Sequence, residues 1–217
     1  MSTNSLRRAV HRGTEAPQTG APVLVLLHGY GSNEEDLIGL APHMDARLIS
    51  VSARAPHELP FGGFAWFNIE WREDGIRFDY DQAWDAVRQV DALVNEVKRD
   101  YSPSGIVIAG FSQGAAMALA LGLSRPDAFV GVAALSGLCG EELMPSDRES
   151  VRGLPVFMSH GCQDEVIAIE QVRAAKPLLQ SLPVELTYRE YETMGHAIDA
   201  ECLADLKTWL EKRLPSA

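Results

Sequence analysis

Short runs of apolar residues alternate with segments of helical periodicity along almost the whole chain. The runs at 23–27 and 106–111 are continuously apolar, which is typical of strands buried on both faces of a sheet. Residues 81–99 carry apolar side chains at helical spacing, and an Ala/Leu-rich stretch at 113–123 also predicts a helix. This alternation predicts βαβ units, and therefore an α/β fold with a mostly parallel central sheet and helices on both faces.

The rest of the chain continues the same pattern. Further strands are expected at 48–52, 129–135, 156–159 and 184–191, and helices at 169–182 and 199–213. Residues 1–21 are polar and interrupted by Gly and Pro, so we expect them to supply at most an N-terminal edge strand or hairpin. A length of 217 residues suits a single domain, 1–217, with its own core.

The chain is acidic, with 30 Asp and Glu against 19 Lys and Arg and a net charge of -11. Such a surface repels phosphate groups, which argues against nucleic acid and anionic lipid as partners. No apolar run has the length needed to span a bilayer, so no stable membrane insertion is expected.

The three cysteines, Cys139, Cys162 and Cys202, are widely spaced and form no C-x-x-C pair. This spacing argues against a zinc site and against a disulfide framework. A reducing, cytoplasmic location fits this use of cysteine best, and no metal site is expected.

Residues 53–80 form the longest stretch without a regular pattern, and they hold seven of the 16 aromatic residues. Irregular segments of this length in a compact domain usually have a function. The seven are Phe61, Phe64, Trp66, Phe67, Trp71, Phe78 and Tyr80. They can line an acyl pocket as a substrate loop or form a minor core beneath it, and the sequence leaves both interpretations open.

The sequence Gly110-Phe111-Ser112-Gln113-Gly114 stands directly between a predicted strand and a predicted helix. A strand-to-helix turn this sharp brings the positions two before and two after the serine together, so only small residues fit there. The turn strains the serine backbone and presents its hydroxyl at a helix N-terminus, where amide groups favour an anion. Ser112 is therefore the predicted nucleophile; an ordinary glycine-flanked turn or a helix-capping serine is the alternative.

A serine hydroxyl needs a base to accept its proton. Among the six histidines, His196 follows a late predicted strand and precedes the last helix, and Gly195 beside it permits a tight approach. His28 and His160 each end a strand and precede a glycine, so we expect them to brace turns by hydrogen bonds. The remaining three fit surface or loop positions: His11, His43 and His57.

The base in turn needs an acid that holds its tautomer and stabilises the imidazolium. Asp164 follows a late central strand and precedes His196 in the chain, whereas Asp199 fits the N-cap of the last helix. The resulting order is Ser112, Asp164, His196. This is the chain order of α/β-hydrolases and differs from the orders of chymotrypsin and subtilisin.

An oxyanion intermediate requires two preorganised hydrogen-bond donors. The backbone N–H of Gln113, the residue after the nucleophile, is one candidate. The loop 28–33 follows the first central strand and contains two glycines that let its backbone close on the site, and the Tyr30 N–H is the second candidate. A dinucleotide-binding loop is the alternative for 28–33, but Glu34 stands where that motif has its third glycine and would repel a pyrophosphate.

Five segments together resemble the phospholipase/carboxylesterase branch of the α/β-hydrolases, which includes acyl-protein thioesterases: 28–31, 66–67, 110–115, 160–164 and 195–196. The resemblance extends from about Val23 to Leu210. It implies hydrolysis of an ester or thioester without a cofactor, through the three residues already singled out. It also implies oxyanion donors at Tyr30 and Gln113, and it suggests a homodimer.

Three positions depart from the pattern of that family. Ser32 and Asn68 stand where the family tends to have Asp, and Glu165 stands where a Pro is common. The first two departures favour a plain carboxylesterase over an acyl-protein thioesterase.

α/β-Hydrolases commonly insert a cap between the strands that end near Leu135 and begin near Val156. The segment 136–155 is too short for a lid domain, so we expect no large cap domain and an open site. The resemblance places Trp66 and Phe67 nearest to Ser112 in the substrate wall, with Leu138 as a further member.

We therefore expect a serine esterase that cleaves a small-molecule ester with a short to medium acyl chain. Thioesters of acylated proteins and lysophospholipids are alternative substrates. A non-catalytic ligand-binding protein on a hydrolase scaffold is the alternative of another class, because a fold does not determine a function.

Overall fold

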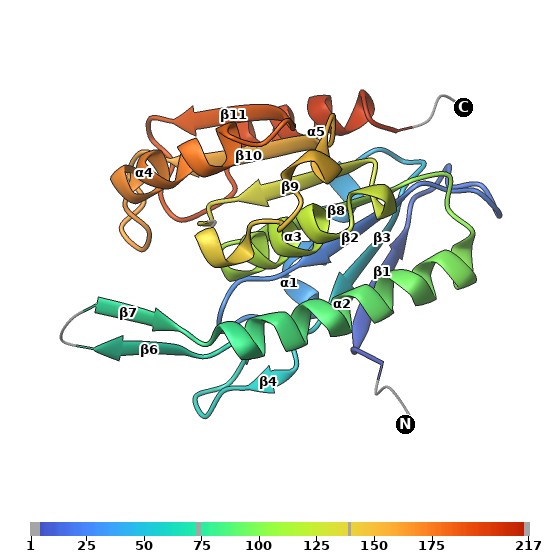
Figure 1. The fold of residues 1–217 in the computed structure, drawn as a ribbon. Helices are drawn as coiled ribbons and strands as arrows, with labels where there is room; N and C mark the ends of the chain where they lie inside the picture. Colours follow the sequence, from blue (N-terminus) through green and yellow to red (C-terminus); the bar gives the residue numbers. More distant parts are fainter. Residues whose placement is uncertain (1–4, 73–74, 139, 215–217) are drawn as a thin grey trace.

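A seven-stranded sheet runs through the centre of the molecule (Figure 1). The computed structural model describes residues 5–72, 75–138 and 140–214. The strand order is β1-β3-β2-β8-β9-β10-β11, and every neighbouring pair is parallel except β1 and β3. The strands are β1 Arg8–Arg12, β2 Val23–Leu27, β3 Ile49–Ala53, β8 Ile106–Phe111, β9 Gly131–Leu135, β10 Pro155–Gly161 and β11 Glu185–Tyr191. This order confirms the predicted α/β-hydrolase fold with a mostly parallel sheet.

Helices cover both faces of the sheet, as the alternation predicts. They are α1 Glu34–Ile38, α2 Tyr80–Tyr101, α3 Gln113–Ser124, α4 Ile169–Gln180 and α5 Ala200–Glu211. Val23, Val25 and Leu27 of β2 share a buried cluster with α2, α3 and α4, whereas Leu24 and Leu26 share the opposite cluster with α1 and α5. Because successive strand side chains point to opposite faces, a continuously apolar strand contributes to two cores at once.

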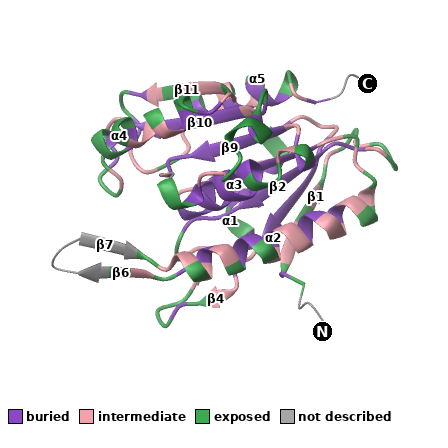
Figure 2. Ribbon diagram, viewed as in Figure 1, coloured by how far each residue is buried: buried purple, intermediate pink, exposed green. Residues whose placement is uncertain are grey.

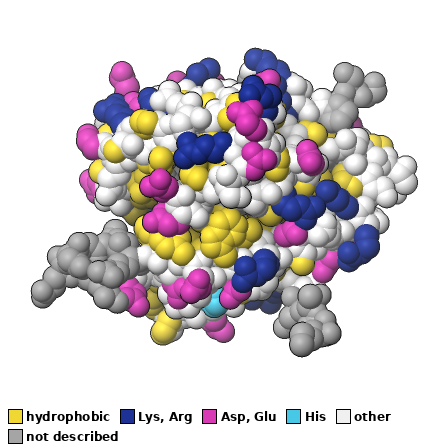
Figure 3. Space-filling model, viewed as in Figure 1, with side chains coloured by type: hydrophobic (Ala, Val, Ile, Leu, Met, Phe, Trp, Pro, Cys, Tyr) yellow, Lys and Arg dark blue, Asp and Glu magenta, His cyan; other side chains and the backbone are white. Residues whose placement is uncertain are grey.

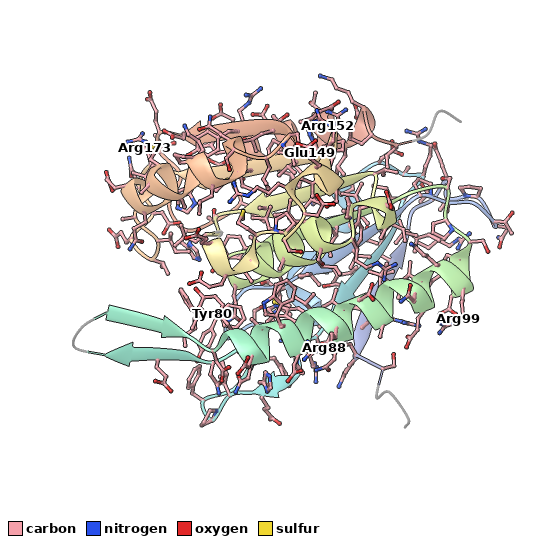
Figure 4. All side chains as sticks on the ribbon, in the orientation of Figure 1. Tyr80, Arg88, Arg99, Glu149, Arg152 and Arg173 are labelled. Carbon is pink, nitrogen blue, oxygen red and sulfur yellow. The ribbon has the colours of Figure 1, made fainter. Side chains whose placement is uncertain are left out.

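Helix α3 lies deepest in the molecule, and its residues 113–123 are all buried (Figure 2). It contacts β8, β9 and α2. Helix α2 has only one buried face, which includes Val87, Val90 and Val94. Arg88 and Arg99 lie on its outer side, away from the sheet (Figure 4). A helix that is apolar all round, as α3 is, is stable only when its neighbours enclose it.

The segment 53–80 contains two small hairpins, where the sequence shows no regular pattern. Strand β4, His57–Glu58, pairs with β5, Phe64–Ala65, and β6, Ile69–Arg72, pairs with β7, Gly75–Phe78. The β6–β7 hairpin projects from the body of the molecule (Figure 1). Strands of two to four residues are too short to show a measurable alternation, which is why the pattern predicts none. The side chain of Trp71 lies outside the part that the structure describes.

The segment between β9 and β10 is occupied by two 3-10 helices, Glu141–Leu143 and Arg148–Val151. Two more lie elsewhere, at Ala41–His43 and Pro126–Ala128. Between β9 and β10 the described residues contain no large cap domain, in agreement with the length argument. The loops after β2, β8, β10 and β11 therefore meet at one uncovered edge of the sheet, which is where ligands bind in open α/β folds.

Candidate active site

Ser112 forms the turn between β8 and α3, with φ 55° and ψ -117°. A positive φ is rare for a residue with a side chain and persists only where the surroundings enforce it. A Cβ at Gly110 would lie 2.0 Å from the Gly114 oxygen, and a Cβ at Gly114 would lie 2.0 Å from the Leu27 oxygen. Only glycine fits at either position, so the G-x-S-x-G motif is a strand-to-helix turn of the predicted kind.

Ser112, His196 and Asp164 form a continuous chain of hydrogen bonds. The Nε2 atom of His196 lies 2.9 Å from Ser112 Oγ, and its Nδ1 atom lies 2.7 Å from Asp164 Oδ2. The three residues follow β8, β11 and β10, so parallel strands bring them to the same sheet edge. A carboxylate can only accept from Nδ1–H, which leaves Nε2 free to accept the proton of the serine hydroxyl.

The Asp164 carboxylate is fully buried and has four hydrogen-bond donors around it. Its Oδ1 accepts the N–H groups of Val166 and Ile167 at 2.9 and 2.8 Å, and its Oδ2 faces His196 at 2.7 Å and His160 at 3.0 Å. Burial raises the pKa of this carboxyl, but the bonds from Ile167, His196 and Val166 outweigh it and hold the pKa below its ordinary value. Asp164 is therefore charged at neutral pH.

His160 is buried behind Asp164. Its Nε2 lies 2.8 Å from the Ile167 oxygen and 3.0 Å from Asp164 Oδ2, so it braces the turn as expected and also contacts the carboxylate. Burial lowers the pKa of His160, and the bond to Ile167 and the charge of Asp164 offset this only in part. The ring is neutral, with its proton on Nε2, and its Nδ1 has no hydrogen-bond partner among the described residues. The sequence signal for this contact is the spacing of four residues between His160 and Asp164.

The loop that carries His196 approaches β10 at Gly161. A Cβ at Gly161 would lie 2.1 Å from the Met194 oxygen and 2.4 Å from the Gly195 oxygen. A Cβ at Gly195 would meet only the Gln163 oxygen, at 3.6 Å. The sequence indicates Gly195 as the position of tight approach, and this prediction is wrong. The crowded glycine is at the end of β10, because two parallel strands place their following loops in contact.

The segments that carry the two expected oxyanion donors both adjoin Ser112. Gln113 is the first residue of α3, and the loop of Tyr30 approaches so closely that a Cβ at Gly29 would lie 3.3 Å from Ser112 Cβ. Within the described residues no acceptor takes a hydrogen bond from the N–H of Tyr30 or Gln113. Two unused N–H groups beside a serine hydroxyl can bind a negative oxygen.

His28 braces the start of the Tyr30 loop, as expected. The ring is buried, and its Nδ1–H donates to the Gly29 oxygen at 2.7 Å while its Nε2 accepts the Ala55 N–H at 3.0 Å. Burial lowers the pKa of His28, and the bond to Gly29 opposes this shift only in part. The ring is neutral and links the loop to the segment after β3.

The three residues expected in the substrate wall differ in how far they are buried. Trp66 exposes none of its surface, Phe67 exposes 6%, and Leu138 is half-buried against the main core. The ring of Phe67 packs edge-on against Phe78, with centroids 5.8 Å apart. Four side chains near the sheet edge are large, apolar and exposed: Tyr30, Phe61, Phe78 and Val166. On the face seen in Figure 3, apolar side chains gather near the middle, between α3 and α2.

Two further properties bear on the class of site. Among the described residues no three His, Cys, Asp or Glu side chains are grouped so that they can hold a metal ion. None of the described helices is both long and apolar enough to cross a bilayer.

The Gly161 contact generates a prediction with a matched control. Gly161→Ala should displace the His196 loop, lower the melting temperature and reduce kcat/KM for an aryl ester, because its Cβ overlaps two backbone oxygens. Gly195→Ala adds a Cβ at ordinary contact distance and should keep both quantities near wild type. Thermal unfolding and steady-state kinetics of the pair decide between the two positions, and equal effects would contradict the assignment to Gly161.

The two buried neutral histidines generate a pH prediction. Because the folded-state pKa values of His28 and His160 lie below the ordinary value of 6.5, the unfolded chain binds more protons below that pH. The free energy of unfolding should therefore fall as pH is lowered below about 6.5, by up to about 1.4 kcal/mol per pH unit for each histidine. Urea unfolding between pH 5 and 7.5 measures this slope. His160→Gln should flatten it and surface His43→Gln should not; an unchanged slope in His160→Gln would contradict the account.

Known proteins resemble this chain over most of its length. The family model described as Phospholipase/Carboxylesterase matches residues 11–214. An acyl-protein thioesterase 1 of Kluyveromyces lactis is 28% identical over 91% of this chain and 94% of its own. A probable carboxylesterase of Oryza sativa subsp. japonica is 32% identical over 87% of this chain and 86% of its own.

Two solved structures have the same fold over nearly the full length. Esterase PE8 has a TM-score of 0.82 and 26% identity, covering 97% of this chain and 100% of its own. The Bacillus cereus carboxylesterase has a TM-score of 0.81 and 25% identity, covering 98% and 97%. With the family model matching almost the whole chain, the protein belongs to the phospholipase/carboxylesterase family of α/β-hydrolases, a family of carboxylic ester hydrolases.

Proposed function

We propose that this protein hydrolyses carboxylic esters with short to medium acyl chains through an acyl-enzyme on Ser112. The observation that carries the proposal is the hydrogen-bonded chain from Ser112 through His196 to the buried Asp164 carboxylate. A nucleophile, a base and a group that orients the base, all within hydrogen-bond distance, are the arrangement that serine hydrolysis requires.

The reaction follows from the roles of these atoms. The Nε2 of His196 takes the proton of Ser112 Oγ as this oxygen bonds to the ester carbonyl carbon. The carbonyl oxygen becomes negative and accepts the N–H groups of Tyr30 and Gln113. His196 then gives the proton to the departing alcohol oxygen, which leaves an acyl group on Ser112. Water then attacks the acyl carbon while His196 takes its proton. The acid leaves as His196 returns that proton to Ser112 Oγ.

Asp164 supports both halves of the reaction. Its bond to Nδ1–H keeps the proton of neutral His196 on the correct nitrogen. When His196 becomes an imidazolium, the adjacent negative charge stabilises it. The pKa of Asp164 lies below its ordinary value, so this charge is present at neutral pH.

The substrate class is inferred from the walls of the site and from the relatives. The family resemblance places Phe67 and Leu138 near Ser112, where they would offer a limited apolar surface, since Phe67 is almost fully buried and Leu138 is half-buried. No cap domain stands between β9 and β10 in the described residues, so we infer that the sheet edge admits a small-molecule ester. Thioester and lipid-ester hydrolysis is the alternative, which the thioesterase among the relatives favours. A non-catalytic binding protein is the alternative of another class, and an intact hydrogen-bonded triad argues against it.

We also propose a cytoplasmic location, which is supported by the free thiols of Cys162 and Cys202. The homodimer that the family resemblance suggests stays a prediction, and the mass of the protein in solution tests it.

Loss of the nucleophile should remove turnover without unfolding the chain. Ser112→Ala and His196→Ala should each lower kcat/KM for p-nitrophenyl butyrate by several orders of magnitude, and the double variant should be little worse, because the residues act as a unit. A fluorophosphonate should label wild-type Ser112 and not Ser112→Ala. Asp164→Asn should lower kcat/KM less than either of these two substitutions does. Additive losses, or a Ser112→Ala variant with a tenth of wild-type activity, would contradict the mechanism.

The open site also predicts the chain-length profile. Each methylene removed from water contributes about 0.8 kcal/mol, so kcat/KM should rise several-fold per carbon and then level off. A p-nitrophenyl ester series from acetate to palmitate measures the profile. Leu138→Ala should shift it toward shorter chains, whereas Leu203→Ala, a half-buried leucine on α5, serves as the matched control. A maximum at palmitate, or a sharp increase at the micelle threshold, would contradict the open site.

A further inference from the structure

Residues 63–67 contact both elements that carry the oxyanion donors, and the first contact is with the Tyr30 loop. The Gly31 N–H donates to the Phe64 oxygen at 2.9 Å, and the Phe64 N–H donates to the Ser32 oxygen at 2.8 Å. Gly63 has φ 75°, and a Cβ there would lie 1.9 Å from the Gly31 oxygen. An isolated β-bridge between Ser32 and Phe64 therefore holds the loop in place. The loop packs so closely on residue 63 that only glycine fits there.

The second contact is with the start of α3. The side-chain amide of Gln113 is buried, and its Oε1 accepts the Trp66 N–H at 2.8 Å. Its Nε2–H donates to the Phe67 oxygen at 2.7 Å. Gln113, whose backbone N–H is one expected oxyanion donor, thus binds two consecutive residues of the segment 63–67 through the oxygen and the nitrogen of its side-chain amide.

The third contact joins Trp66 to the residue that begins the Tyr30 loop. The Trp66 Nε1–H donates to the His28 oxygen at 2.8 Å, and the two rings pack with centroids 5.4 Å apart. His28 begins the Tyr30 loop. Trp66 exposes no surface, so this bond is shielded from water and its loss would leave a buried carbonyl without that donor.

We propose that residues 63–67 set the distance and orientation between the two oxyanion donors, and that the Trp66 indole and the Gln113 side chain are positioning residues. This inference rests on the proposed function of Ser112. Donors stabilise an oxyanion only when they lie about 2.7–3.1 Å from where it forms. The Tyr30 loop contains Gly29 and Gly31, the latter at φ 81°, so its own backbone restrains the donor weakly.

Trp66→Phe tests the inference because it removes the Nε1–H and keeps an aromatic ring. The matched control is Trp209→Phe, since Trp209 is 5% exposed, lies in the opposite core cluster, and its Nε1 has no partner among the described residues. Trp66→Phe should lower kcat for p-nitrophenyl butyrate about tenfold or more, with little change in KM. Trp209→Phe should lower the melting temperature and leave kcat near wild type.

A second readout separates donor geometry from stability. The thionoester analogue replaces the carbonyl oxygen by sulfur, a weak hydrogen-bond acceptor. An intact pair of donors should favour the oxygen ester strongly, and Trp66→Phe should reduce the ratio of kcat/KM for ester over thionoester several-fold. Gln113→Asn, whose shorter amide cannot span both Trp66 N and the Phe67 oxygen, should reduce the ratio too and is the alternative if Trp66→Phe does not fold.

Two results would overturn the inference. An unchanged ester-to-thionoester ratio in Trp66→Phe and Gln113→Asn would show that the donors keep their positions without these bonds. A raised KM with unchanged kcat would instead make Trp66 a member of the substrate wall. Labelling of wild-type Ser112 by a fluorophosphonate is measured in parallel, so that failure of the proposed function is distinguished from failure of this inference.

Discussion

Helix α3 begins in backbone contact with β2, and the geometry of the whole sheet edge depends on this contact. The space between Gly114 and the Leu27 oxygen cannot hold a Cβ. The approach forces Ser112 to φ 55°, a strain of about 1–3 kcal/mol. The buried side chains of Met117, Leu119 and Leu121 each contribute about 1.5–3 kcal/mol and offset that strain. The same packing that encloses α3 therefore holds the serine hydroxyl at the sheet edge, where Ser112 is partly buried.

A second constraint is the negative charge of Asp164, which is buried beside His196. An isolated buried carboxylate is very costly, and Asp164 is tolerated because both of its oxygens are fully bonded. His160 supplies one of those bonds without adding a charge, because burial keeps its ring neutral. A cationic His160 would neutralise Asp164 and remove the attraction that an imidazolium at His196 experiences. The neutral state of one histidine thus preserves the charge on which the other depends.

Local pattern was enough to predict the strands of the central sheet, the helices α2 to α5 and the Ser112 turn, because continuous apolar runs, helical spacing and the glycines at 110 and 114 depend on neighbouring residues. The short helix α1 was not predicted. Local pattern was also not enough for contacts between distant segments. The crowding at Gly161 arises from the loop before His196, more than 30 residues later in the chain, and nothing local marks it. The hairpins within 53–80 are equally hidden, since Trp66 is placed by His28 and Gln113 rather than by its own neighbours.

The absence of a cap between β9 and β10 in the described chain has a consequence for how the site can work. Enzymes with lids can order their donors when the lid closes over substrate. In a site without a lid domain, hydrogen-bond donors have to be in place before the substrate arrives, because solvent reorganisation would otherwise cost part of the stabilisation. Here the bonds from Phe64 to Gly31 and Ser32 form as the chain folds. The conformational entropy of the glycine-containing loop is lost at that stage, so binding of an ester need not supply it.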